Sequence, residues 1–107
     1  MPAWLYLVGA IVSEVCGTVI LPFTDGLRRP GLTVLMLACY GLSIWLLALA
    51  LKSLDLGLSY AIWAGSGTAL VAIIGMAVLG EPVNALRLLG IALVVAGIVS
   101  LNLAGAQ

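Results

Sequence analysis

The sequence has no histidine, only two cysteines and very few charged residues. Four basic and four acidic side chains make 7% of its 107 residues charged, whereas soluble domains carry about 25%. Four scattered cations cannot neutralise an array of phosphates, which excludes a nucleic-acid binder that works through a basic patch. With no histidine and only four carboxylates, most enzymes that use acid–base catalysis are excluded as well. We therefore expect no enzyme and no nucleic-acid partner.

The two cysteines, Cys16 and Cys39, both lie inside apolar runs. Disulfide staples belong to small, loop-rich secreted chains, and two lone thiols match no metal-binding pattern. We expect both thiols to serve as small apolar fillers, and we expect no metal site.

Apolar residues dominate the rest of the chain. They make up 64% of it, and the mean hydropathy is +1.33. A helix that crosses a bilayer needs about 20 mainly apolar residues, and four such stretches are present, at about residues 3–23, 31–51, 57–79 and 85–103. We predict an all-α integral membrane protein, with residues 1–107 forming a single domain of four transmembrane helices. Because four helices make a thin bundle, we also expect self-association.

Seven of the eight charged side chains lie in or beside the breaks between these stretches: Asp25, Arg28, Arg29, Lys52, Asp55, Glu81 and Arg87. Charges at these positions are solvated at the level of the lipid headgroups, and the basic ones bias the orientation of the chain. One side of the membrane carries three cations and the other carries only Lys52. This small excess does not strongly specify the direction of insertion.

The eighth charge, Glu14, lies near the middle of the first apolar stretch. A charged side chain at the bilayer centre costs about 3 kcal/mol or more, and such residues usually serve a function. The sequence places no lysine, arginine or histidine at that depth to pair with it. A proton or a cation from water would satisfy the carboxylate, and competition between the two is enough to couple their movements. The alternative is a permanently protonated glutamate that acts as a hydrogen-bonding strut between helices.

Residues at helical spacing share the face of Glu14, and they are the candidates for lining a pocket: Leu7, Ala10, Ile11, Gly17, Thr18 and Leu21. Ala10, Gly17 and Thr18 are small and leave space beside the carboxylate, but close helix packing also requires small residues. The face alone therefore does not decide between a cavity and a helix interface. Thr18 is placed to hydrogen-bond either Glu14 or its own backbone.

Aromatic residues lie at membrane depth in the second and third stretches. Tyr60 and Trp63 are three residues apart, and Tyr40 lies near the middle of the second stretch. Aromatic faces attract cations, and a tyrosine hydroxyl can donate to a carboxylate. We expect Tyr60 and Trp63 to contribute to a cation site with Glu14.

Small residues mark two further positions. The segment Gly65-Ser66-Gly67 lies within the third stretch, where it predicts either close packing or a kink that acts as a hinge and opens the site to one side at a time. Gly90 and Gly97 lie seven residues apart in the fourth stretch. Their stripe predicts close contact between two helices, such as those of two protomers.

Together these residues resemble the small multidrug resistance (SMR) transporters, close to the EmrE-like subgroup that exports quaternary ammonium and polyaromatic cations. The resemblance covers nearly the whole chain. It rests on Glu14-Val15-x-Gly17-Thr18, Asp25-Gly26, Tyr40, Ser43, Gly57-x-x-Tyr60-Ala61-Ile62-Trp63-x-Gly65-x-Gly67, Glu81-Pro82, and Gly90 with Gly97.

The resemblance implies a multi-pass protein of the prokaryotic inner (cytoplasmic) membrane, built as an antiparallel homodimer of dual topology. It implies a proton-coupled antiporter in which Glu14 of both protomers binds either protons or a lipophilic or quaternary ammonium cation, with protons as the coupling ion and no cofactor. It also implies roles for further residues: substrate binding by Tyr60, Trp63 and Tyr40, pocket lining by Ser43, a kink at Gly65, Ser66 and Gly67, and a dimer contact at Gly90 and Gly97.

Two details of the sequence keep alternatives open. Guanidinium exporters of the family typically carry a tryptophan three residues after the glutamate, where this sequence has Gly17; this favours bulky cations, although Glu81-Pro82 looks like the guanidinium group. The family usually has a lysine late in the first helix, where this sequence has Pro22. Pro22 therefore supports a further hypothesis, in which this chain is a non-transporting subunit of a heterodimer with a related chain.

Overall fold

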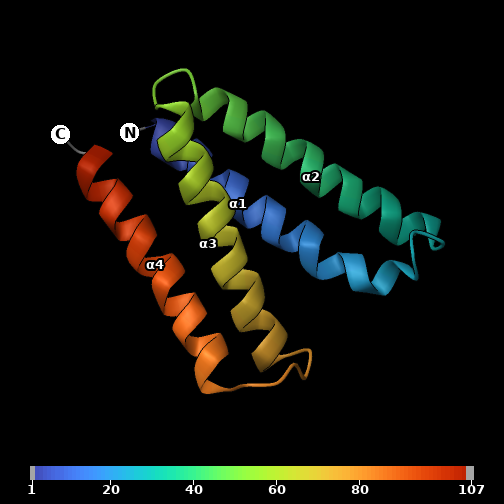
Figure 1. The fold of residues 1–107 in the computed structure, drawn as a ribbon. Coiled ribbons are helices and arrows are strands. Elements are labelled where there is room, and N and C mark those ends of the chain that lie inside the picture. The colour runs from blue at the N-terminus through green and yellow to red at the C-terminus, as the bar shows by residue number, and fades with distance from the viewer. Residues whose placement is uncertain (1, 106–107) are drawn as a thin grey trace.

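The computed structural model describes residues 2–105, which form four long α-helices (Figure 1). They are α1 (Pro2–Ile20), α2 (Pro30–Ala50), α3 (Leu56–Ala77) and α4 (Ala85–Gly105). All four spans are long and apolar enough to cross a membrane. The prediction of an all-helical membrane fold with four spans is therefore confirmed.

The first span changes its helix type near its end. Its α-helix ends at Ile20, before the expected limit at residue 23, and the chain continues as the 3₁₀ helix η1 (Leu21–Thr24). Pro22 causes this change, because it has no N–H to donate to the α-helical ladder and its ring clashes with the preceding turn.

Thr24 organises the turn that follows. Its side chain is fully buried, and its hydroxyl donates to the carbonyl oxygen of Leu21 (2.8 Å) and accepts from the N–H of Leu27 (3.1 Å). Asp25, Gly26 and Leu27 have φ angles of 53°, 66° and 69°, a left-handed conformation that is unusual for leucine. The Thr24 hydrogen bonds hold this turn, from which α2 runs back along α1 (Figure 1).

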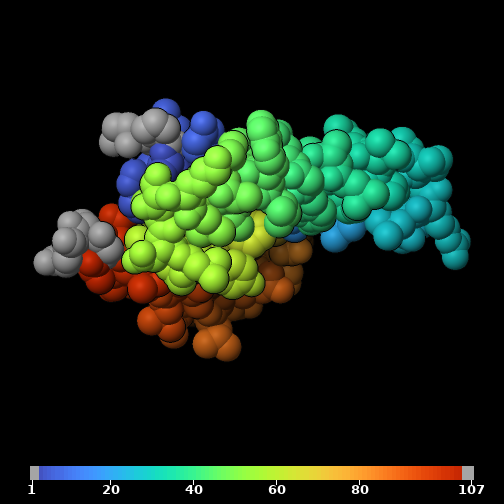
Figure 2. Space-filling view, turned by 90° about the horizontal axis from the view of Figure 1, so that it is seen from above, coloured from blue at the N-terminus to red at the C-terminus, as the bar shows by residue number. Residues whose placement is uncertain are grey.

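The four helices form two hairpins that diverge from a shared end. α1 packs against α2 and α3, and α4 packs against α3. Figure 1 shows that the α1–α2 turn and the α3–α4 turn lie far apart, and Figure 2 shows the α1–α2 turn extending beyond the other hairpin. The molecule measures 45 × 35 × 17 Å. Its thinnest dimension is less than two helix diameters, since one helix with side chains is about 10–12 Å across.

The buried core lies where α1, α2 and α3 meet. It consists of Leu7, Ala10, Ile11, Val15, Leu47, Ala50 and Ile62. By contrast, the membrane-spanning part of α4 buries none of its residues within the protomer. Lipid tails accept exposed apolar side chains, so this exposure is compatible with a helix in a bilayer.

Candidate functional site

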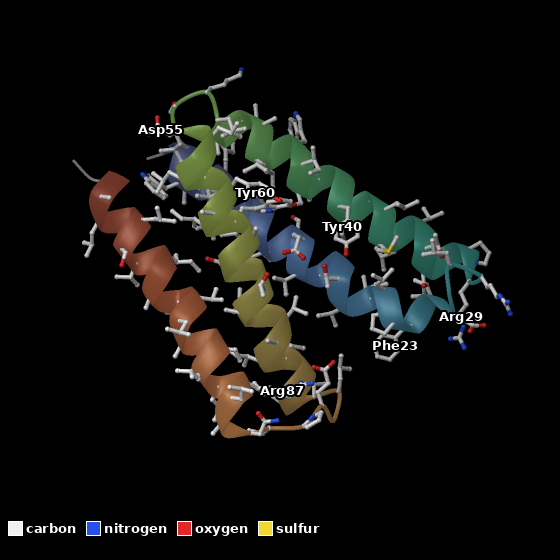
Figure 3. All side chains as sticks on the ribbon, in the orientation of Figure 1. Phe23, Arg29, Tyr40, Asp55, Tyr60 and Arg87 are labelled. Atoms are coloured by element: carbon white, nitrogen blue, oxygen red, sulfur yellow. The ribbon has the colours of Figure 1, made fainter. Side chains whose placement is uncertain are left out.

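Glu14 belongs to a hydrogen-bonded group of three side chains from α1 and α2. The carboxylate is half-buried and accepts a hydrogen bond from Oγ1 of Thr18, one turn later on α1. The hydroxyl oxygen of Tyr40 lies 2.7 Å from the same Thr18 oxygen, and Figure 3 shows the Tyr40 side chain pointing from α2 toward α1. A threonine hydroxyl has one proton to donate. Because Thr18 donates that proton to Glu14, the Tyr40 hydroxyl donates to Thr18. Both hydrogen bonds therefore point toward the carboxylate.

The third helix approaches the carboxylate at Gly67. This glycine is buried, and a Cβ placed on it would overlap Oε1 of Glu14 and lie 3.2 Å from Cδ. Any other residue at this position would push the carboxylate or α3 away. Gly67 therefore allows α3 to pack directly on the group that carries the buried charge.

A second polar group joins the same three helices. Oγ of Ser43, on α2 and fully buried, donates to the carbonyl oxygen of Ala10 on α1 (2.6 Å) and accepts from Nε1 of Trp63 on α3 (3.0 Å). The Trp63 ring lies beside that of Tyr60, with centroids 5.7 Å apart and planes tilted by 48°. Tyr60, labelled in Figure 3, remains 56% exposed. The two aromatic residues thus form a pair in which Ser43 holds the Trp63 ring.

A cavity of about 340 Å³ opens beside Glu14, between α1 and α3. Its lining residues are Glu14, Thr18, Gly67, Thr68, Val71, Ala72 and Glu81. Glu14 and Glu81 are the two charged residues among them. The volume lies in the range of small-molecule sites, about 300–1,000 Å³.

Sequence reasoning placed Glu81 among the charges at the membrane surface and in the Glu81-Pro82 motif, but it did not connect Glu81 with Glu14. The structure brings both carboxylates to one cavity. A signal for this connection is present in α3, because Gly67, Val71 and Gly75 recur at intervals of four residues and lead along one helix face toward Glu81.

The other candidates for pocket lining divide between the core and a helix contact. Leu7, Ala10 and Ile11 lie in the buried core and are not among the residues that line the Glu14 cavity of the protomer. Gly17 packs against Tyr40, where a Cβ would be 3.0 Å from ring atom Cδ1. Within the protomer these residues therefore pack between helices and Thr18 reaches the cavity, while their role in lining a substrate pocket stays a prediction.

The glycines of the Gly65-Ser66-Gly67 segment face two different helices. A Cβ on Gly65 would lie 2.9 Å from Cδ1 of Ile98 on α4, while Gly67 faces Glu14 on α1. Ser66 lines a groove between α3 and α4, and α3 is a continuous α-helix through this segment. Close packing accounts for both glycines, and the hinge stays a prediction.

Gly90 and Gly97 lie on an open surface of α4. Both are exposed, and a Cβ on either would meet nothing within 4 Å. Their role as a dimer contact stays a prediction, for which the protomer leaves the required surface free.

The two carboxylates of the cavity differ in their partners, because Glu81 forms an ion pair and Glu14 accepts a hydrogen bond from a neutral group. Within residues 2–105 the structure contains one ion pair, between Nη1 of Arg87 and Oε1 of Glu81 at 3.5 Å, and both side chains are about half exposed. Glu14 is stabilised by the hydroxyl of Thr18. The described residues contain no group of three or more histidine, cysteine, aspartate or glutamate side chains that could hold a metal ion.

Four membrane spans and a half-buried carboxylate in a cavity are features of a membrane transporter. Comparison with known proteins identifies the family: the model described as "Small Multidrug Resistance protein" matches residues 2–94. The chain belongs to the Small Multidrug Resistance family, as the sequence motifs indicated.

Relatives of the chain include transport proteins of two bacteria. The chain is 36% identical to the multidrug transporter EmrE of Escherichia coli, over 96% of this chain and 94% of that protein. It is 47% and 44% identical to the nicotine metabolites export pump subunits NepB and NepA of Paenarthrobacter nicotinovorans, over 95% and 97% of this chain. These matches cover 61% of NepB and 90% of NepA. The four spans and the bacterial relatives identify a multi-pass protein of the bacterial inner membrane.

Proposed function

We propose that the chain is a proton-coupled antiporter that exports hydrophobic or quaternary ammonium cations and has no enzymatic activity. The observation that carries this proposal is the placement of Glu14. It is a half-buried carboxylate in a membrane span, it lines a cavity of about 340 Å³, and its hydrogen bond within the protomer comes from a neutral hydroxyl. A carboxylate in that setting is stabilised either by a proton or by a cation.

Competition for Glu14 provides the coupling. A bound cation needs the negative charge that a proton removes, so one group does not hold both at the same time. Binding of a cation therefore releases a proton, and binding of a proton releases the cation. Exchange across the membrane follows when the site opens to each side in turn, with protons as the coupling ion and no other cofactor.

Tyr60 and Trp63 supply the aromatic part of the cation site. The indole N–H of Trp63 is already bonded to Ser43, so its ring face is what Trp63 offers to a ligand. Tyr60 is exposed on the protomer surface beside it. Aromatic faces attract quaternary and delocalised cations without requiring N–H donors, which supports the choice of bulky lipophilic substrates.

An antiparallel homodimer is the assembly that we propose for this activity. A protomer only 17 Å thick, with a glycine stripe exposed on α4, lacks the enclosure that a hydrated cation pathway requires. Contact through Gly90 and Gly97 would bring two such protomers together, with Glu14 of each at the shared site. The small excess of cations on one side of the membrane is compatible with insertion in both directions.

A second candidate function is that of one subunit in a pump built from two related chains. The names of NepA and NepB describe them as export pump subunits, and Pro22 stands where the family usually has a lysine. Expression of this chain alone separates the two functions. Binding and transport by the single chain support the homodimer, whereas activity that requires a second related chain supports the heterodimer.

Transport by reconstituted protein tests the main proposal. Proteoliposomes containing the unaltered chain should accumulate tetraphenylphosphonium when a proton gradient is imposed, and Glu14→Gln should abolish this uptake. Asp25→Asn is the matched control, because it removes a carboxylate from an exposed turn. Coupled uptake that persists in the Glu14 variant would contradict the proposal. Faster uptake of guanidinium than of tetraphenylphosphonium would favour the guanidinium exporters instead.

A further inference from the structure

We propose that Glu81 is an outer cation-binding carboxylate of the Glu14 cavity, that Arg87 is its displaceable counter-ion, and that this pair favours cations carrying N–H donors. The inference rests on the proposed function, because it assigns a second binding position for cations in the cavity of Glu14. Glu14 remains the position at which protons and cations compete.

The backbone conformation after α3 holds Glu81 close to that helix. Gly80 has a φ of +75° and reverses the chain after α3, and the N–H of Glu81 then donates to the carbonyl oxygen of Gly75 (3.0 Å). The carboxyl group lies over Gly75, where a Cβ would be 2.7 Å from Cδ of Glu81. Two glycines and one backbone hydrogen bond therefore hold an acidic side chain against the end of a membrane helix.

The Glu81 side chain, held in this way, lines the same cavity as Glu14. Val71 and Ala72 line that cavity between the two carboxylates along α3, and Glu14 and Glu81 are its charged lining residues. A cation inside the cavity is thus attracted at both ends. Because Glu81 follows the third span, it lies toward the membrane surface, and a cation that approaches from that side meets it before Glu14.

Arg87 demonstrates which kind of cation this carboxylate accepts. Its guanidinium Nη1 lies 3.5 Å from Oε1 of Glu81, and the side chains are 44% and 50% exposed. Exposed pairs of this kind contribute little net stability, so another cation can replace the guanidinium. The backbone N–H of Arg87 is held by Oδ1 of Asn84 (2.9 Å), so the start of α4 does not depend on the ion pair.

The Arg87 side chain lies beside a second cavity, into which it moves when another cation takes its place on Glu81. Arg87 lines this second cavity of about 360 Å³, on the side of α3 that faces α4, and is not among the residues that line the Glu14 cavity. Thr68 and Ala72 line both cavities, which makes them neighbours. A change of side-chain rotamer that breaks the ion pair therefore leaves the guanidinium beside the second cavity and the Glu81 carboxylate in the Glu14 cavity.

The chemistry of the pair selects among cations. A guanidinium or a primary ammonium replaces both the charge and the N–H donor that Arg87 offers, and charge-assisted hydrogen bonds are the stronger ones. A quaternary cation replaces the charge alone. Glu81 should therefore increase affinity for cations with N–H donors more than for tetraphenylphosphonium.

Binding measurements on the purified full chain test this inference with guanidinium and tetraphenylphosphonium as probes. At low salt, Glu81→Gln should weaken guanidinium binding about fivefold and tetraphenylphosphonium binding less than about twofold. Arg87→Gln should strengthen guanidinium binding, but it should have no effect when Glu81→Gln is also present. The control Asp25→Asn removes a carboxylate on the same side of the membrane, since an odd number of spans precedes each residue.

Ionic strength separates a charge effect from a structural one. The difference in guanidinium affinity between the unaltered chain and Glu81→Gln should shrink when salt rises from about 0.01 M to about 1 M, as the screening length falls from about 30 Å to about 3 Å.

The inference is overturned if Glu81→Gln binds guanidinium like the unaltered chain, if the two probes are affected equally, or if Arg87→Gln acts equally in both backgrounds. Loss of guanidinium binding in Glu14→Gln with none of these effects at Glu81 would refute only the inference. Unchanged binding of both probes in Glu14→Gln would refute the proposed function.

Discussion

The junction of α1, α2 and α3 differs from α4 in burial and in hydrogen bonding between helices. At the junction, two hydrogen-bonded groups of polar side chains connect the helices, with Thr18, Tyr40 and Glu14 in one group and Ser43, Trp63 and the Ala10 carbonyl in the other. On α4 the spanning residues are unburied and Ser100 bonds only within its own helix. The protomer therefore holds the polar groups of the site where three helices meet, while α4 stays exposed and free for the dimer contact that we propose.

The largest effect expected from this difference concerns Gly67. We predict that Gly67→Ala weakens tetraphenylphosphonium binding by at least about tenfold, because its Cβ would overlap the Glu14 carboxylate and overpacking costs about 1–3 kcal/mol. Gly57→Ala is the control on the same helix, since a Cβ there meets nothing within 4 Å. Equilibrium binding to purified protein checks the prediction. Equal affinities for the two variants would show that α3 does not constrain the carboxylate.

A change on α4 should affect assembly and leave the protomer intact. Gly97→Leu is predicted to weaken self-association about tenfold, because a bulky side chain separates the paired helices. Gly41→Leu is the matched control, for Gly41 also has open space around it but lies on α2. Crosslinking yield across a dilution series in detergent measures the association. If both variants associate as the unaltered chain does, α4 is not the dimer contact.

A smaller effect is expected from the polar group at Ser43. Ser43→Ala leaves the indole N–H of Trp63 without its partner and should lower the free energy of unfolding by about 1 kcal/mol. Ser100→Ala should leave it unchanged, because that hydroxyl is exposed and bonds to Ala96 of its own helix. Reversible denaturation in mixed micelles measures both. A larger loss in the Ser100 variant would reverse the ranking of the two regions.

The smallest effect is expected from Tyr40, which reaches Glu14 through Thr18. Tyr40→Phe keeps the ring and removes the hydroxyl, so affinity for tetraphenylphosphonium should fall only about twofold. Tyr6→Phe, on an exposed position of α1, should have no effect. Loss of all binding in Tyr40→Phe would show that the hydroxyl contacts the substrate directly.

Sequence reasoning succeeded where a single strong physical effect decides the outcome. Apolar length alone predicted four spans, and the cost of burying a charge singled out Glu14. It failed to choose the hydrogen-bond partner of Thr18, because both partners lie within reach of a threonine on a helix. In the structure, the rotamer of Thr18 directs its hydroxyl to the Glu14 carboxylate.

Three-dimensional contacts explain the remaining differences. The face around Glu14 is wide, and packing against α2 and α3 placed Leu7, Ala10 and Ile11 in the core. The connection between Glu81 and Glu14 depends on the reversal at Gly80 and on the divergence of two hairpins. The spacing of Gly67, Val71 and Gly75 indicates the helix face that leads toward Glu81, but it does not predict the reversal of the chain at Gly80.

The central claim is that Glu14 binds either a proton or the exported cation. Proton release measured in weakly buffered solution, while tetraphenylphosphonium is added to the purified chain, tests it most directly. The account predicts that binding releases protons in the unaltered chain and releases none with Glu14→Gln. Cation binding to the unaltered chain without any release of protons, from acid to alkaline pH, would contradict it.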